Sequence, residues 1–178
     1  MNGLRDKWDA RYREAMVGEQ AATPLLAAHR HRLPPRGRAL DLACGLGADA
    51  LLLARAGLDV DAWDLSPVVI AKLEAYAATH HLSLRAEVRD VTVHPPEAGR
   101  YDVIVVAHFL ERALCAAIAA ALRPGGLLFY QTFGPTGPGP ANPAFRLTHR
   151  ELPQLFAGLE LLVYGEEGEV QLVARRPR

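Results

Sequence analysis

The fold is decided by residues 38–47, RALDLACGLG, in which a short apolar strand runs directly into a glycine turn. Residues 48–56 then predict a helix that ends at Gly57. Glycines let a backbone approach a ligand closely, and the N-terminus of the following helix offers unpaired N–H groups. The segment therefore predicts the first strand, turn and helix of an α/β domain that binds an extended cofactor.

The same alternation of strands and helices continues toward the C-terminus. Further strands are predicted at 59–63, 82–88, 101–107 and 127–132, and helices at 66–80 and 110–122. Strands at 159–164 and 170–174 must be antiparallel neighbours, because the connection between them is too short for a crossover. We predict an α/β fold with a doubly wound, Rossmann-like, mostly parallel seven-stranded sheet, a C-terminal antiparallel hairpin and helices on both faces.

Two segments lie outside this alternation. Near the N-terminus, Leu4, Trp8 and Tyr12 recur at the spacing of one helix face, and a second helix is expected at 24–33. Residues 134–143 are rich in proline and glycine and predict a loop. Beyond this loop, Thr148 and Glu151 form a capping-box pattern for a short helix that reaches Phe156.

Composition limits the classes of partner. Lysine plus arginine and aspartate plus glutamate both number 20, so no overall positive field favours nucleic acid or an anionic membrane. Two cysteines favour a reducing cytoplasm, and the longest apolar stretch, 113–122, is too short to span a bilayer. The histidines show no metal-ligand spacing. We expect a cytoplasmic protein with a small-molecule substrate and without metal, nucleic acid or membrane; the oligomeric state stays open.

Acidic residues follow or interrupt the first three predicted strands. Asp64 stands 23 residues after Asp41, near the offset of about 20 at which an acid receives the hydroxyls of a ribose. Asp41 lies inside its strand, where a buried carboxylate needs hydrogen bonds from turn amides or from an ammonium group of the ligand. Asp90 ends the third strand, and either adenine recognition or a turn explains it equally well.

The motifs at the strand ends resemble, in their order, those of class I S-adenosylmethionine-dependent methyltransferases. They are residues 41–47 (DLACGLG, with Ala43 at the position of the usual first glycine), 64–67 (DLSP), 89–91 (RDV), 101–105 (YDVIV) and 123–126 (RPGG). The segment Trp8-Asp9-Ala10-Arg11-Tyr12 resembles the W-x-x-R-Y cap of the small tellurite-resistance and thiopurine-type methyltransferases. The resemblance implies a single methyltransferase domain over 1–178, with cap helices in 1–35 and an S-adenosylmethionine-binding core in 36–178.

The resemblance also implies where the cofactor binds. Asp41, Gly45 and Gly47 would contact the methionine part, and Asp64 the ribose. Asp90 and Val91 would contact the adenine, and Ala107 with His108 the region near the sulfonium. The full set of expected cofactor-binding residues is Asp41, Ala43, Cys44, Gly45, Gly47, Asp64, Leu65, Asp90, Val91, Ala107, His108 and Tyr12.

His108 and Arg112 are the candidate catalytic residues. His108 follows the fourth strand directly, where it could act as a base or position the cofactor. Arg112 could hold an anionic substrate, or pair with Glu111 or the loop. Further residues that could line the acceptor side are Thr132, Phe133, Asn142 and Phe145. Trp8 and Tyr12 could close the pocket or pack in the core.

The predicted function is methyl transfer from S-adenosylmethionine to a small nucleophilic acceptor: a soft anion, a thiol or a small metabolite. One alternative is an NAD(P)-dependent oxidoreductase, although Ala43 and Ala48 would then replace two of the three glycines in the G-x-G-x-x-G pattern. The other alternative is a non-catalytic S-adenosylmethionine-binding or regulatory protein.

Overall fold

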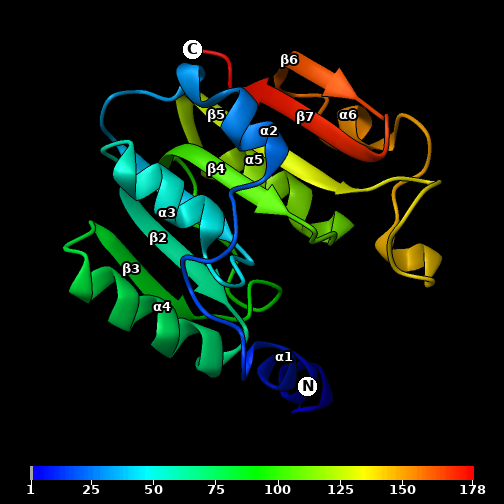
Figure 1. The fold of residues 1–178 in the computed structure, drawn as a ribbon. Coiled ribbons are helices and arrows are strands. Elements are labelled where there is room, and N and C mark those ends of the chain that lie inside the picture. Colours follow the sequence, from blue (N-terminus) through cyan, green and yellow to red (C-terminus); the bar gives the residue numbers. More distant parts are fainter. Residues whose placement is uncertain (1) are drawn as a thin grey trace.

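Figure 1 shows the computed structural model, which describes residues 2–178 as one sheet flanked by helices. The strands are β1 (Arg38–Leu42), β2 (Asp59–Asp64), β3 (Leu84–Val88), β4 (Tyr101–Ala107), β5 (Leu122–Phe133), β6 (Glu160–Gly165) and β7 (Glu169–Arg175). The α-helices are α1 (Asn2–Tyr12), α2 (Pro24–Ala28), α3 (Ala48–Arg55), α4 (Pro67–Thr79), α5 (Cys115–Ala121) and α6 (Glu151–Leu155). Short 3-10 turns are η1 (Arg30–Arg32), η2 (Arg112–Leu114) and η3 (Pro143–Phe145). Within the described residues, no helix combines the length and apolar character that crossing a membrane requires.

The sheet has seven strands in the order β3-β2-β1-β4-β5-β7-β6. β1 pairs in parallel with both β2 and β4, while β7 runs antiparallel between β5 and β6, which confirms the predicted hairpin. The direction of winding reverses between β1 and β4. In open α/β sheets, ligands bind at the carboxyl ends of the strands beside such a reversal. The predicted glycine turn, which directly follows β1, lies at this edge.

Helices cover both faces of the sheet, as predicted. On one face, α2, α3 and α4 pack over strand residues such as Ala39, Val60 and Val103. On the other face, α5 and α6 pack over residues such as Leu40 and Ile104. Neighbouring residues of one strand therefore enter different cores, because successive side chains point to opposite faces of a sheet. The continuous apolar run at 103–107 in β4 follows from this double burial.

Three predicted boundaries differ from the structure. The helix expected at 110–122 begins as α5 only at Cys115, because the Glu111 side chain accepts the Ala113 amide at 3.2 Å and starts the turn η2 first. The helix expected at 24–33 ends at Ala28 and continues as η1. The predicted turn at 123–126 lies inside β5 as a bulge, since the pairing with β4 jumps from Leu122 to Leu127.

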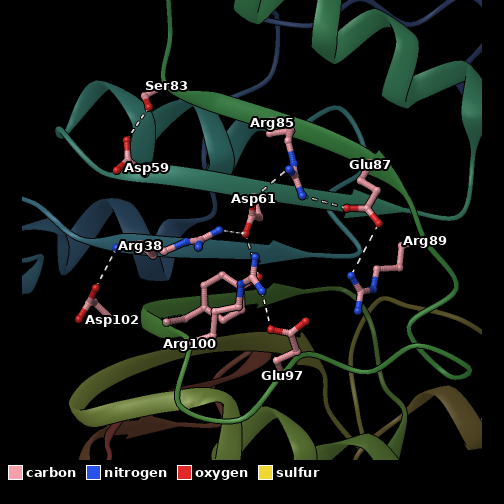
Figure 2. A network of polar contacts seen from close by, with 11 residues as sticks. Arg38, Asp59, Asp61, Ser83, Arg85, Glu87, Arg89, Glu97, Arg100 and Asp102 are labelled. Atoms are coloured by element: carbon pink, nitrogen blue, oxygen red, sulfur yellow. Dashed lines mark hydrogen bonds and ion pairs between the residues drawn. The ribbon is translucent and has the colours of Figure 1, made fainter.

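A polar network occupies the face of β2 and β3 opposite to α3 and α4 (Figure 2). Its centre is Asp61, a buried residue whose carboxylate binds the Arg38 guanidinium at 3.0 Å and the Tyr101 hydroxyl at 2.9 Å. Farther along, the guanidinium of Arg89 lies 3.9 Å from the ring centre of Trp63. Residues 89–100, which join β3 to β4, contain no helix. Charged side chains rather than a helix therefore cover this part of the sheet.

Tyr101→Phe is expected to lower the free energy of unfolding by about 1 kcal/mol, because Asp61 loses a buried hydrogen bond. Urea denaturation followed by circular dichroism measures this change. The matched control is Tyr76→Phe, which removes a hydroxyl that accepts from Arg55 at an exposed site and should change stability by less than about 0.5 kcal/mol. Equal losses in the two variants would contradict the assignment of Asp61 as the centre of the network.

Candidate functional site

The turn after β1 is built from three residues with left-handed backbone conformations. Ala43, Gly45 and Gly47 have φ values of +58°, +53° and +73°. A side chain at Gly47 would also collide with α4, because a Cβ atom there would lie 2.7 Å from the methyl carbons of Leu73. Ala43 adopts a conformation that L-residues disfavour, and the surrounding hydrogen bonds must hold it there. The turn brings its amides close to the end of β2.

Asp64 links the turn to the end of β2. Its carboxylate accepts the amide of Gly45 at 2.9 Å and the amide of Ser66 at 3.0 Å, and only 8% of the residue is exposed. Burial raises the pKa of this carboxyl. A carboxylate has about four acceptor positions, so these two hydrogen bonds leave acceptor capacity for a diol. The ribose-binding role expected of this residue stays a prediction.

Asp41 and Asp49 form a second, deeper pair of acids at the N-terminus of α3. Asp41 is 2% exposed and accepts the Ala50 amide at 2.9 Å, so its donor is a helix amide rather than the turn amide expected from the sequence. Asp49 accepts the amide and hydroxyl of Thr23 at 2.7 and 3.1 Å. Burial, and for Asp41 also the neighbouring charge of Asp49, raises the pKa of both carboxyls. Sequence reasoning missed Asp49, although an acid in the first turn of a helix after a glycine turn is a usable signal.

Helix α1 closes over the turn. Trp8 and Tyr12 stack with ring centres 5.8 Å apart, and the Tyr12 hydroxyl lies 3.0 Å from the position that a Cβ atom on Gly45 would take. Lys72 on α4 holds the end of this helix by donating to the carbonyls of Tyr12, Arg13 and Ala15 at 2.7, 2.7 and 2.8 Å. Tyr12 thus lies over the glycine turn and against the core, and its part in binding the cofactor stays a prediction. Nothing local in the sequence indicated the role of Lys72.

The residues after β3 form the outer edge of the site. Asp90 accepts the amide and hydroxyl of Thr92 at 3.0 and 2.6 Å, and these bonds lower its pKa. It therefore acts as a turn residue, and it also lines a shallow cavity of about 290 Å³ with Arg89 and His94. Val91 is buried in the core on the α5 face.

The cysteine of the glycine turn, Cys44, is explained better by packing than by reactivity. Burial raises the pKa of its thiol, which disfavours the reactive thiolate.

His108 lies at the reversal of the sheet, directly after β4, with a left-handed φ of +52°. Its Nε2 atom lies 2.7 Å from Oε1 of Glu169, the first residue of β7. The ring stacks on Phe133 with centres 5.0 Å apart. Phe133 is thus the one candidate of the acceptor side with a contact to His108, since Phe145 is 53% exposed and Asn142 caps η3. The fourth candidate, Thr132, is buried.

Arg112 is fully engaged by the loop that precedes α6. Its guanidinium binds both carboxylate oxygens of Glu151 and donates to the carbonyls of Ala144 and Arg146 at 3.0 and 2.9 Å. Of the two structural alternatives, pairing with the loop is the one that the structure shows, while the Glu111 side chain caps η2. Glu151 also accepts the Thr148 amide at 2.7 Å, which is one half of the predicted capping box. The other half is absent, because α6 begins at Glu151 with Arg150 as its N-cap and the Thr148 hydroxyl donates to Glu151. All three guanidinium nitrogens are occupied, so Arg112 is placed to hold this loop.

Residues 39–126, which contain the turn, Asp64, Asp90 and His108, match the family described as a methyltransferase domain. The strand order and the acid at the end of β2 agree with this match. Residues 39–126 therefore belong to the methyltransferase-domain family. The resemblance drawn from the strand-end motifs is thereby confirmed, and the nicotinamide-dependent oxidoreductase loses its support.

Curated relatives of this chain share about a third of their aligned residues with it. Hemagglutinin 1 of Eikenella corrodens is 37% identical over 138 residues, which is 72% of this chain and 46% of that protein. The ubiquinone biosynthesis O-methyltransferase of Xanthomonas campestris pv. campestris (strain B100) is 34% identical over 110 residues, which is 57% of this chain and 45% of that enzyme. The chain thus spans about half the length of the curated relatives it matches.

A solved structure supports the fold over nearly the whole chain. TehB from Haemophilus influenzae superimposes with a TM-score of 0.77 at 21% identity, covering 95% of this chain and 67% of that protein. At this identity the likeness concerns the fold.

Asp41→Asn is expected to stabilise the fold at pH 8, because asparagine still accepts the Ala50 amide and carries no buried charge. The folded-state pKa of Asp41 is raised, so the folded protein holds a proton that the unfolded chain loses above pH of about 4. The free energy of unfolding of the wild type should therefore decline as the pH rises from about 4 through the folded-state pKa of Asp41. Guanidinium unfolding at pH 5 and pH 8 measures the difference.

The advantage of Asp41→Asn should be larger at pH 8 than at pH 5. The matched control is Asp59→Asn, at the exposed start of β2, which should give the same small effect at both pH values. A variant that is no more stable than the wild type at pH 8 would contradict the cost assigned to the buried charge.

Proposed function

We propose that the chain binds S-adenosylmethionine at the edge between β1 and β4 and transfers its methyl group to a small nucleophilic acceptor. The observation that carries this proposal is the buried Asp64 carboxylate, held against the amide of Gly45 within residues that match the methyltransferase family. An acid at the end of β2 with free acceptor positions suits the two hydroxyls of the cofactor ribose. The N-terminus of α3, which follows the turn directly, suits the polar end of its methionine part.

The remaining cofactor contacts follow from the same placement. Asp41 would act on the methionine ammonium through the start of α3, and Asp90 with Val91 would border the adenine. Ala107 and His108 end β4 and would lie beside the sulfonium. Tyr12 on α1 would close the site above the turn, which supports the exclusion of water during transfer. When bound, S-adenosylmethionine supplies an electrophilic methyl group, and the protein has to align an acceptor with it.

A small acceptor suits the surroundings of His108. The formal net charge of the chain is zero, so it offers no strongly charged docking surface for a macromolecule. The loop at 142–151 is tied to η2 by Arg112 and borders this end of the sheet, where it can shape a pocket for a small molecule. The relative named as a ubiquinone biosynthesis O-methyltransferase supports an acceptor that is a small metabolite.

Isothermal titration with S-adenosylhomocysteine is expected to give micromolar binding to the wild-type chain, and NADH none. Asp64→Ala should weaken this binding about tenfold or more, because it removes hydrogen bonds between a charged group and the ribose. The matched control is Asp59→Ala, which lies at the other end of the same strand and should retain the wild-type affinity.

Absence of S-adenosylhomocysteine and S-adenosylmethionine binding in a folded protein would overturn the proposed function. Binding that is lost equally in both variants would remove the specific role of Asp64. Retention of cofactor without methylation of any acceptor in a panel of thiols, amines, phenols, selenite and tellurite would instead favour a non-catalytic cofactor-binding protein.

A further inference from the structure

The hydrogen bonds around His108 determine where its proton lies. Leu25 on α2 donates its backbone amide to Oε1 of Gln131 at 3.0 Å. A backbone amide can only donate, so this bond fixes the oxygen of the Gln131 side chain toward α2. The Gln131 amide group must then point the other way, and its Nε2 lies 2.5 Å from Oε2 of Glu169. Glu169 therefore accepts at this oxygen.

The same carboxylate sets the tautomer of His108. An ionised carboxylate only accepts hydrogen bonds, so the Nε2 atom of His108, 2.7 Å from Oε1 of Glu169, must carry the proton. The ring cannot easily turn away, because it stacks on Phe133. The backbone amide of His108 also donates to the Gln131 carbonyl at 2.9 Å. Nδ1 is then the unprotonated nitrogen, and within residues 2–178 no side chain or backbone group bonds to it.

We infer that Glu169 is a positioning residue that makes Nδ1 of His108 a proton acceptor, so that the acceptor substrate is a hydroxyl or amine rather than a thiolate or soft anion. This inference rests on the proposed function. The His108 side chain is 45% exposed at the end of β4, so a small molecule can reach it. The other acid whose charge acts on His108 is Asp49, which is engaged by Thr23.

The reaction balances with these groups. The oxygen or nitrogen of the acceptor forms a bond to the methyl carbon, and the carbon–sulfur bond breaks with its electron pair left on sulfur. The proton of the acceptor passes to Nδ1 of His108. The positive charge of the sulfonium is thus replaced by that of an imidazolium, and the Glu169 carboxylate stabilises this charge. A thiolate or soft anion has no proton to give up and would need no such arrangement.

The test uses Glu169→Gln. The orientation of the Gln131 side chain is fixed by Leu25, so it determines how the side-chain amide of the substituted residue must be oriented. In this variant, the amide group of Gln131 would donate to the side-chain oxygen of the glutamine at position 169. The NH2 group of that glutamine would then face Nε2 of His108. Nε2 must become the acceptor, and the proton must move to Nδ1. Long-range proton–nitrogen NMR on the full chain, assigned with His108→Gln, reads the tautomer directly. The matched control is Glu167→Gln, an exposed residue of the same hairpin connection.

We expect the Nε2–H tautomer in the wild type and in Glu167→Gln, and the Nδ1–H tautomer in Glu169→Gln. With catechol or a primary amine as acceptor, Glu169→Gln should lower kcat about 100-fold or more, the size of effect typical of a lost general base. Its affinity for S-adenosylhomocysteine should stay within about twofold of the wild type, since the hydrogen bonds of Asp64 do not involve Glu169.

A wild-type Nδ1–H tautomer, or an unchanged tautomer in Glu169→Gln, would overturn the inference. So would methylation of 2-mercaptoethanol or selenite alone, or a wild-type rate of Glu169→Gln on catechol. Failure of the proposed function would look different from failure of this inference. In that case the wild type would not bind S-adenosylhomocysteine, whichever tautomer His108 adopts.

Discussion

The carboxylate of Asp64 is the contact on which the site depends. It accepts one amide from the glycine turn and one from the start of α4, and so joins the ends of β1 and β2 to the helix that follows β2. A buried carboxylate is costly unless hydrogen bonds satisfy it, and the turn supplies one of them only while Gly45 keeps its left-handed conformation. The turn geometry and the acid therefore hold each other in place. The cofactor site we propose uses the acceptor capacity that remains.

Three buried acids meet at this edge of the sheet, and their pKa values are all raised. Burial alone would favour replacing them with neutral residues, because the charged forms lose hydration. The cofactor that we propose carries a sulfonium and an ammonium group, and these positive charges would favour the charged forms of the acids. Perturbed acids that cluster beside a ligand-binding edge are a frequent mark of functional sites.

Two long-range contacts connect peripheral segments to the site. Lys72 on α4 binds three carbonyls at the end of α1 and directly after it, which places Tyr12 over the glycine turn. Arg112 binds the loop before α6 with all three of its nitrogens. Each cation satisfies several backbone carbonyls at once, which orders segments that have few core contacts of their own. The cap and the loop are therefore part of the site rather than independent of it.

The sequence by itself determined the class of fold, the strand positions and the cofactor edge, because these follow from local patterns: apolar runs, the glycine turn and an acid at a fixed offset from it. The tertiary structure alone decided the partners of Arg112, the donor to Asp41, the role of Lys72 and the tautomer of His108. Glu169 lies 61 residues from His108 in the chain, and no local pattern links them. Such pairs form only when β7 inserts between β5 and β6, and that placement depends on the packing of the whole sheet.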